Sequence, residues 1–342
     1  MTDSNVPTRP RIGELPTGPL NALSDVPGVT VGHATRRDGD ARTGVTVIRP
    51  HGGDLFREKL PAATHVFNGF GKSVGLMQVD ELGQIETPIA LTNTFSVGTV
   101  ATALIRRAIA ANPEIGRRTG TVNPVVLECN DGHLNDIQGF HVNEADVAAA
   151  LADARVDIAR GAVGAGTGMS AFGLKGGIGT ASRRLDLDGR TFHLGALVLA
   201  NFGRRPDFRL DGRPVPDAHA APDAPDRGSV IVVLGTDVPL EHRQLARVAR
   251  RAVVGLVRVG SYLGHGSGDI ALAFSTADHI AHDERRDLLP RHALNESRSD
   301  LMFRACAEAV EDAVIDALWS AEATTGRDGH RREALTRPPA GA

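Results

Sequence analysis

The bond between Gly228 and Ser229 joins two segments of opposite character. Residues 204–228 are rich in proline and aspartate, whereas the residues that follow, Ser-Val-Ile-Val-Val-Leu-Gly, are typical of a fully buried strand. If the chain is cut at this bond, Ser229 becomes a new N-terminus. Its hydroxyl is then a nucleophile and its own α-amine a base, a known variant of hydroxyl-plus-base catalysis. The alternative interpretation is a serine that opens a strand after a loop.

The segment before Ser229 has few side chains to bury. Residues 204–228 contain five prolines and five aspartates. A structureless loop of about 25 residues is uncommon inside a compact domain and is usually functional or disordered. We therefore expect 204–228 to be a flexible cleavage linker. The α-amine released by cleavage has a reference pKa of about 7.7–8.0, so that part of it is neutral near pH 7.

Three further polar residues stand where predicted strands begin or end. Ser267 and Asp269 belong to the segment Leu-Gly-His-Gly-Ser-Gly-Asp, between a predicted helix and a predicted strand. There a hydroxyl and a carboxylate can orient the amine of Ser229 and relay protons. Asn201 ends an apolar run before the linker, where its amide can donate to an oxyanion. The alternatives are a glycine turn for the first segment and an ordinary turn residue for Asn201.

A block of polar residues, Glu-Cys-Asn-Asp-Gly-His-Leu-Asn-Asp, follows the predicted strand 125–129. We interpret it as a pocket wall in which Glu128 pairs with a substrate ammonium. Asn130 and His133 are the other candidate substrate-binding residues of this block. The alternative is a solvated turn. The segment 92–98, Thr-Asn-Thr-Phe-Ser-Val-Gly, precedes a predicted helix and reads as an N-terminal cap.

Common cofactor and metal motifs are incomplete. Gly69-Phe-Gly-Lys-Ser hints at a phosphate loop, but that pattern requires glycine where Val66 stands. Gly164-Ala-Gly-Thr-Gly lacks the third glycine of a dinucleotide fingerprint, because the position holds Met169. The thirteen histidines are scattered and form no HExxH motif. We therefore expect neither a cofactor nor a metal.

The composition is that of a globular protein. The 342 residues carry a net charge of −3, with 41% hydrophobic and 23% charged residues, and no long basic run indicates nucleic-acid binding. Cys129 and Cys306 lie far apart and suggest neither a disulfide framework nor a metal site. Residues 1–10 lack the apolar core of a secretory signal, and no apolar run reaches the roughly 18 residues that span a bilayer. We expect a cytoplasmic protein without a membrane partner.

The elements that must position these residues alternate between short strands and helices. The patterns predict a hairpin over 183–201 that turns at Asp188-Gly189, and glycine-rich turns over 161–179. We expect further strands at 29–33, 44–48, 64–68, 125–129, 229–235 and 269–275, and helices at 99–111, 143–154, 240–259 and 297–324. The arrangement favours a two-sheet core with helices on both outer faces and no boundary between two folding domains. Residues 1–10 and 325–342 read as disordered tails.

Several of these segments together resemble one family, the DmpA/β-peptidyl aminopeptidase family. The resemblance spans roughly residues 11–320, with its blocks in the family's order. It is carried by LPTGPLNA at 15–22, DVPGVTVGH at 25–33, RTGVTVI at 42–48, PIALTNT at 88–94, DGHLND at 131–136, GSVIVV at 228–233 and RVGSYLGHGSGDI at 258–270.

The resemblance implies an autoprocessing aminopeptidase with an N-terminal serine nucleophile. The implied fold is an α/β four-layer αββα sandwich of DmpA/ornithine acetyltransferase type, similar to the Ntn hydrolases but with different connectivity. The precursor would cut itself between Gly228 and Ser229 into chains 1–228 and 229–342, which stay interlocked in one domain. The implied assembly is a homotetramer of such heterodimers. The implied substrates are small peptides or amino-acid amides and esters.

The resemblance also implies roles for single residues. Ser229 matches the nucleophile, Ser267 and Asp269 match the assisting pair, and Asn201 matches the oxyanion donor. Glu128 matches the acidic residue near the substrate amine.

One departure from the family pattern concerns a tyrosine. The family's best-known members use a phenol near the pocket, but the single tyrosine of this chain is Tyr262, in the segment that leads to Ser267. Asn130 or His133 stands available in its place.

Two other functions compete with the aminopeptidase. One is a related autoprocessing amidohydrolase or acyltransferase that acts on a non-peptide amide. The other is an uncleaved, inactive binding homologue. The sequence leaves open whether the substrate carries L-, D- or β-amino acids.

Overall fold

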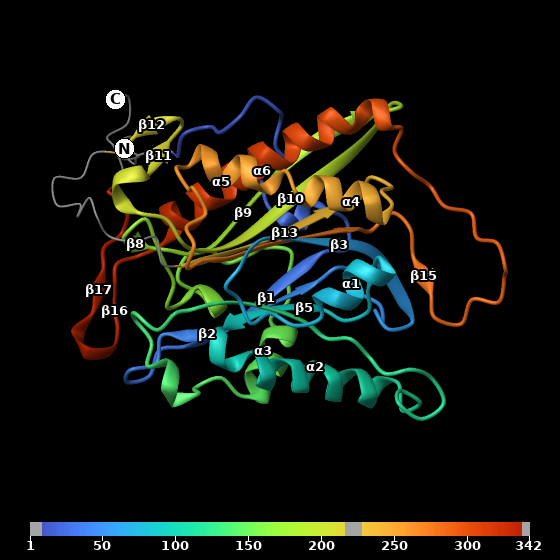
Figure 1. The fold of residues 1–342 in the computed structure, drawn as a ribbon, viewed down its shortest axis with the longest axis horizontal. Helices are drawn as coiled ribbons and strands as arrows, with labels where there is room; N and C mark the ends of the chain where they lie inside the picture. Colours follow the sequence, from blue (N-terminus) through green and yellow to red (C-terminus); the bar gives the residue numbers. More distant parts are fainter. Residues whose placement is uncertain (1–8, 216–227, 337–342) are drawn as a thin grey trace, which may run out of the picture.

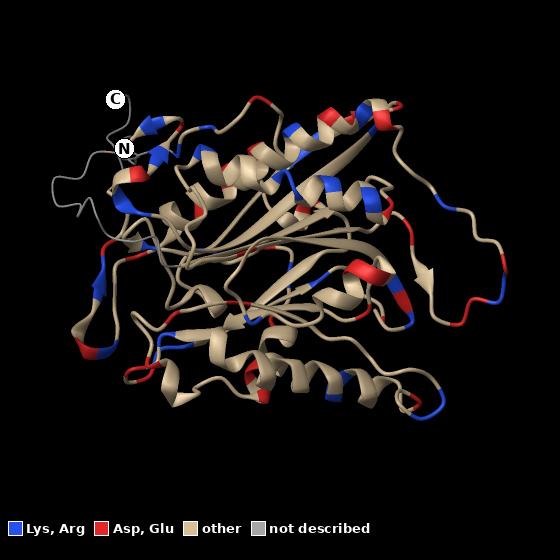
Figure 2. Cartoon of the chain, in the orientation of Figure 1, with Lys and Arg blue, Asp and Glu red and all other residues tan. Residues whose placement is uncertain are grey.

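The structure, a computed structural model, describes residues 9–215 and 228–336. Two β-sheets stack face to face, and helices cover the outer face of each sheet (Figure 1). This arrangement confirms the predicted four-layer αββα sandwich. Acidic and basic residues lie mainly on the outer helices and loops, while the two sheets are mostly uncharged (Figure 2).

The larger sheet has seven strands and contains the strand that begins at Ser229. Its strands lie in the order β15-β3-β14-β13-β10-β9, and β4 pairs with β3. Their bounds are β3 Glu58–Gly69, β4 Gln84–Ile85, β9 Gly177–Leu187, β10 Arg190–Asn201, β13 Ser229–Thr236, β14 Gly268–Ser275 and β15 Ile280–Ala281. β13 and β14 run parallel, whereas the other neighbours in this sheet pair antiparallel. The alternation of side chains along a strand places Val230 and Val232 towards the helices and Ile231 and Val233 towards the other sheet.

The smaller sheet has four strands in the order β1-β2-β5-β6. Their bounds are β1 Thr30–Arg36, β2 Thr43–Arg49, β5 Ile89–Asn93 and β6 Val125–Cys129. β5 and β6 are parallel, so that their carboxyl ends meet at one edge. All five residues of each of these two strands are buried, as expected for strands covered on both faces.

Six α-helices lie in the described residues, and five of them form the two outer layers. Their bounds are α1 Leu76–Leu82, α2 Val97–Ala111, α3 Glu144–Ala152, α4 His242–Ala249, α5 Ala252–Arg258 and α6 Ser299–Ser320. The sixth, α1, packs beside β3 and β4. α4 and α6 pack on the larger sheet and α5 packs on α6, whereas α2 and α3 cover the smaller sheet (Figure 1). Within the described ranges, none of these helices combines the length and the apolarity required to cross a bilayer.

The predicted local elements agree with the structure at most positions. The hairpin turn at Asp188 and Gly189 has φ values of 48° and 73°, as a two-residue type I′ turn requires. Asn143 caps α3 by accepting a hydrogen bond from the Ala145 N–H. The single helix predicted over 240–259 is wrong, because the chain turns between α4 and α5. Gly255 of α5 faces the backbone of α6 so closely that a Cβ there would lie 2.7 Å from the Ala307 carbonyl oxygen.

Parts of the predicted flexible segments have defined structure. Residues 325–336, expected to belong to a disordered tail, include the hairpin of β16 (Thr324–Thr325) and β17 (Arg331–Arg332). Its backbone is anchored where the Arg327 N–H donates to the Leu134 carbonyl at 2.8 Å. In the expected linker, β11 (Arg209–Leu210) and β12 (Arg213–Pro214) form a second short hairpin. The rest of the predicted linker and tails, 216–227, 1–8 and 337–342, lies outside the described residues. A third short hairpin joins β7 (Ser170–Ala171) and β8 (Leu174–Lys175).

Candidate active site

Strand ends from both sheets meet at one edge of the sandwich. In the larger sheet, Ser229 at the start of β13 pairs with Asn201 at the end of β10 and with Gly268 at the start of β14. In the smaller sheet, β6 places Glu128 at the same edge, where it lines one cavity together with Ser229. The fold therefore brings together residues from three distant parts of the sequence.

The Ser229 hydroxyl is buried and held by two backbone groups. It accepts a hydrogen bond from the Gly268 N–H at 3.1 Å and donates to the Gly228 carbonyl oxygen at 2.8 Å. The chain at Gly228 passes so close to β10 that a Cβ at this position would lie 2.1 Å from the Asn201 carbonyl oxygen. Glycine is therefore required before Ser229, and the Ser229 oxygen lies beside the peptide group that joins the two residues.

Ser267 and Asp269 lie directly behind Ser229. The Ser267 hydroxyl donates to Asp269 Oδ1 at 2.5 Å, and both side chains are buried. Gly268, between them, is the residue whose N–H donates to the Ser229 oxygen. A hydroxyl paired with a buried carboxylate in this position can accept or relay a proton near the start of β13.

The side-chain amide of Asn201 is fixed at both ends. Its oxygen accepts from the Ser170 N–H at 2.8 Å, and its nitrogen donates to the Asn130 carbonyl at 3.0 Å. The oxygen is thus turned away as an acceptor, and one of the two amide hydrogens is used by Asn130. Within residues 9–215 and 228–336 the other hydrogen of this amide nitrogen has no acceptor, and Asn201 lines the cavity.

A buried lysine supports the turn that holds Asn201. Lys175 Nζ donates to the carbonyls of Gly166, Met169 and Gly176 at 2.8–2.9 Å. Three carbonyl acceptors match the three N–H groups of an ammonium. Burial opposes this charge and lowers the pKa of Lys175 to about 7. The turn that ends at Ser170 is therefore organised around the amino group of a fully buried lysine.

Glu128 forms the opposite wall of the site. Its buried carboxylate accepts from the Lys72 backbone N–H at 2.8 Å and from the hydroxyl of Thr94. Within residues 9–215 and 228–336 no basic side chain pairs with it. A buried carboxylate that accepts only neutral donors is suited to a cationic group brought by a ligand.

These residues surround a cavity of about 550 Å³. Its lining includes Phe70, Lys72, Glu128, Asn130, His133, Ile137, Asn201, Gly228 and Ser229. A cavity of this size is in the range of small-molecule sites. All the predicted substrate-binding residues therefore line the same cavity as the predicted nucleophile, with Ser267 and Asp269 behind it.

His133 lies against the C-terminal hairpin. Its ring stacks on that of His330 with 4.8 Å between centroids, and His330 Nδ1 lies 2.9 Å from the His133 carbonyl oxygen. Burial, together with the nearby positive charge of Arg332, lowers the pKa of His133 to about 4. His133 is therefore a neutral side chain at pH 7. Tyr262, by contrast, is 54% exposed and is not part of the cavity lining.

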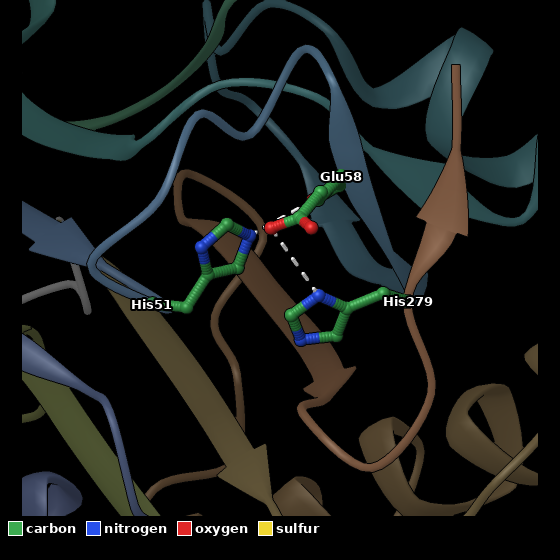
Figure 3. Close-up of side chains that lie close together, drawn as sticks. All are labelled: His51, Glu58 and His279. Atoms are coloured by element: carbon green, nitrogen blue, oxygen red, sulfur yellow. Dashed lines mark hydrogen bonds and ion pairs between the residues drawn. The ribbon is translucent and has the colours of Figure 1, made fainter. Parts of the chain in front are cut away.

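A separate cluster of possible metal ligands lies at the other end of β3. His51, Glu58 and His279 place one ligand atom each within 4.8 Å of one another (Figure 3). Both ring nitrogens of His51 already have partners, because Nδ1 accepts from the Gly53 N–H at 3.0 Å and Nε2 lies 2.8 Å from the Glu58 carbonyl oxygen. The cluster then reduces to an exposed ion pair between His279 and Glu58. It does not provide the free lone pairs that a metal site needs.

Sequence reasoning missed several residues of the site. Thr94 was interpreted as part of a cap, and the cap is made by Asn93, whose side chain accepts from the Phe95 and Ser96 N–H groups. Lys72 belongs to the incomplete phosphate-loop pattern, and no motif in the sequence indicates a role for Lys175. Of these, only Lys72 stood in a recognisable pattern, the Gly-Phe-Gly-Lys segment.

Comparison with known proteins gives consistent similarities over nearly the whole chain. The model of "Peptidase family S58" matches residues 21–332. "Beta-peptidyl aminopeptidase BapA" of Sphingosinicella microcystinivorans is 36% identical over 345 residues, which cover 93% of this chain and 86% of that protein. Among solved structures, the PH0078 protein from Pyrococcus horikoshii OT3 has a TM-score of 0.91 at 48% identity, covering 95% of this chain and 94% of that one. The L-aminopeptidase D-Ala-esterase/amidase from Ochrobactrum anthropi has a TM-score of 0.89 at 37% identity, covering 96% and 94%.

Proposed function

The chain belongs to peptidase family S58, and we propose that Ser229 is the nucleophile of an aminopeptidase that first cleaves its own chain before this residue. The observation that supports the proposal most directly is the position of the Ser229 hydroxyl. It lies beside the Gly228 carbonyl and on a cavity that also contains a buried carboxylate and a fixed amide. The chain is an aminopeptidase of the hydrolase class, and the proposal concerns how its residues perform that reaction.

In the proposed first step, the Ser229 oxygen attacks the Gly228 carbonyl carbon. The bond from that carbon to the Ser229 nitrogen breaks, the hydroxyl proton passes to this nitrogen, and an ester joins the two residues. The acyl shift frees the α-amine of Ser229, and water then hydrolyses the ester, which releases the Gly228 carboxylate and restores the Ser229 hydroxyl. Ser267 and Asp269 are the proposed proton relay for this step, because the Gly268 N–H between them contacts the attacking oxygen.

In the proposed second reaction, Ser229 attacks the carbonyl of the substrate's N-terminal residue. Its α-amine takes the hydroxyl proton and returns it to the leaving amine, so the Ser229 ester of the substrate forms and is hydrolysed by water. The free amide hydrogen of Asn201 stabilises the oxyanion. Glu128 binds the substrate ammonium, which restricts the enzyme to the first residue of a chain.

We propose short peptides and aminoacyl amides with a free ammonium as substrates, including β-peptides, since the relatives from Sphingosinicella are named as β-peptidyl aminopeptidases. Asn130 and His133 are the proposed neutral side chains around the substrate.

We further propose a cytoplasmic tetramer of two-chain units, which light scattering and cell fractionation test. The two free, buried cysteines suit a reducing compartment, and exposed apolar side chains such as Met77 suit a subunit contact.

Denaturing electrophoresis tests the nucleophile. We expect two fragments of 228 and 114 residues, the smaller beginning Ser-Val-Ile-Val. Ser229→Ala is expected to leave one full-length chain without hydrolysis of alanyl, D-alanyl or β-alanyl p-nitroanilide. Ser275→Ala is the matched control, because this buried serine at the other end of β14 donates to the Val238 carbonyl, away from the cavity. Hydrolysis by the Ser229→Ala protein, or an intact wild-type chain, would contradict the proposal.

A further inference from the structure

The cavity around Ser229 is lined by two groups of opposite charge that do not neutralise each other. Glu128 is the acid and Lys72 the base, while His133 on the same wall is neutral at pH 7. The Lys72 backbone N–H touches the Glu128 carboxylate, but across the described residues the Lys72 ammonium forms no ion pair with Glu128 or any other acid. The Lys72 ammonium lies over the ring of Phe70 and is not paired with the carboxylate next to its own backbone.

Lys72 differs from the other two lysines of the chain. Lys59 and Lys175 are buried and bound to protein groups: Lys59 Nζ lies 3.4 Å from a Glu86 carboxylate oxygen, and Lys175 Nζ donates to three carbonyls. Lys72 is exposed, and its Nζ lies 4.1 Å from the centroid of the Phe70 ring, which is itself 64% exposed on the cavity. An ammonium on an open aromatic face keeps hydrogens available for a ligand.

The position of Lys72 relates its charge to the scissile bond. The Phe70 N–H donates to the Ser267 carbonyl at 3.3 Å, and two residues later the Lys72 N–H reaches Glu128. The segment 70–72 thus runs from beside the nucleophile to the carboxylate that is proposed to bind the substrate ammonium. Lys72 therefore lines the cavity on a segment that connects the surroundings of Ser229 with Glu128, where a bound acyl residue would lie within reach of both charges.

We propose that Lys72 binds a carboxylate on the N-terminal residue of the substrate, so that the enzyme prefers aspartyl and β-aspartyl residues over their neutral counterparts. The inference rests on the proposed roles of Ser229 and Glu128. An N-terminal aspartyl residue, linked through either of its carboxyl groups, presents an ammonium and a free carboxylate close to the scissile carbonyl. The two unmatched charges of the cavity complement that pair.

The test compares p-nitroanilides that differ only in the acyl residue: alanyl, α-aspartyl, β-aspartyl, and the two carboxamide analogues of the aspartyl substrates. We expect kcat/KM for at least one aspartyl substrate to exceed that of its carboxamide analogue about tenfold, the size of a charge-assisted contact at a partly exposed site. Lys72→Met is expected to bring this ratio of kcat/KM values to about one. Lys72→Glu is expected to bring it below one and to make lysyl p-nitroanilide a better substrate than aspartyl p-nitroanilide. The ratio, unlike total activity, does not respond to a merely structural loss.

Arg190→Met is the matched control, because this cation also lies on a ring, 5.0 Å from the centroid of Phe192, outside the cavity lining around Ser229. It should change neither the ratio nor the activity. An unchanged ratio in Lys72→Met, or a wild type that hydrolyses alanyl p-nitroanilide without preferring a carboxylate, would overturn the inference and leave the proposed function intact. Alanyl-glycine and alanyl-glycinamide are assayed alongside the p-nitroanilides. If Lys72→Met lowered kcat/KM only for alanyl-glycine, the inference would also be overturned, because Lys72 would then bind a carboxylate of the leaving group. A cleaved protein that hydrolyses none of these substrates would instead contradict the proposed function.

Discussion

Ser229 and Arg183 lie in the same sheet, on β13 and β9, and both are buried among polar groups. The two regions differ in whether the charged groups are paired with opposite charges of the protein. The Arg183 guanidinium donates to Glu308 at 3.2 Å and to Asp312 at 3.1 Å. Its remaining donors reach backbone carbonyls, including that of Ile12 at 2.6 Å. Every charge in this network therefore has an opposite charge beside it.

The site around Ser229 lacks this internal pairing. Among the described residues, the Glu128 carboxylate accepts from a backbone N–H and a hydroxyl and from no basic side chain, and one of the two Asn201 amide hydrogens has no acceptor. A buried polar group without its full set of partners costs free energy unless a ligand supplies them. Burial alone therefore does not distinguish the two regions, since Arg183 and Glu128 are both buried. The difference is that Glu128 lines a cavity and, among the described residues, pairs with no basic side chain.

The largest change is expected when the buried ion pairs around Arg183 are broken. Arg183→Met leaves the buried carboxylates of Glu308 and Asp312 without their central cation, and it should lower the free energy of unfolding by about 3–5 kcal/mol. The measurement is denaturant unfolding in the Ser229→Ala background, where a single uncleaved chain simplifies the equilibrium. Arg184→Met, at the neighbouring exposed side chain, should stay within about 0.5 kcal/mol of the parent. A loss below about 1 kcal/mol for Arg183→Met would remove the basis of the comparison.

The next largest change is expected in the cavity around Ser229. Asn201→Ala removes the proposed oxyanion donor and should lower kcat by a factor of about 10²–10³, equivalent to 2.7–4 kcal/mol of transition-state stabilisation. The rate is measured on protein that has completed cleavage, with active sites counted by the burst of p-nitroaniline. Asn112→Ala is the control, since that buried amide hydrogen-bonds to Asp54 and Arg57 outside the cavity. It should cost stability but not kcat. Equal losses of kcat in the two variants would mean that Asn201 acts only through the fold.

The sequence predicted the parts of this site that depend on strand patterns. The apolar β-branched run after Ser229 predicts a buried central strand, and the Asp188-Gly189 turn fixes the hairpin that ends at Asn201. Once these strands pair, the register places Asn201 opposite Ser229. The strand pattern predicts which residues stand at this edge of the sheet, and the roles of those residues rest on the family resemblance and stay a prediction.

The parts that the sequence did not predict depend on backbone contacts between distant segments. The C-terminal hairpin was expected to be disordered because its residues are polar. It is anchored by the backbone bond from Arg327 to Leu134 and by a close approach at Gly326, where a Cβ would lie 1.9 Å from the Leu134 carbonyl oxygen. The chain also leaves the helix between α4 and α5, and Gly255 of α5 approaches the backbone of α6 closely. Hydrophobic patterns carry no information about such contacts.

The smallest change is expected in the pH dependence of the unfolding free energy and of kcat. The two profiles show which group titrates in the proposed active site. Because the folded-state pKa of His133 is about 4, below the ordinary 6.5, the unfolded chain binds its proton first as the pH falls. The stabilising contribution of neutral His133 is therefore complete above pH 6.5 and is lost between about pH 6.5 and 4. His133→Gln should flatten the loss of unfolding free energy over that window. If the α-amine of Ser229 is the base, the acid limb of kcat should be the same in His133→Gln as in the wild type; the reference pKa of an α-amine is about 7.7–8.0. A limb that moves in His133→Gln would assign the titration to the histidine and would replace the α-amine as the proposed base.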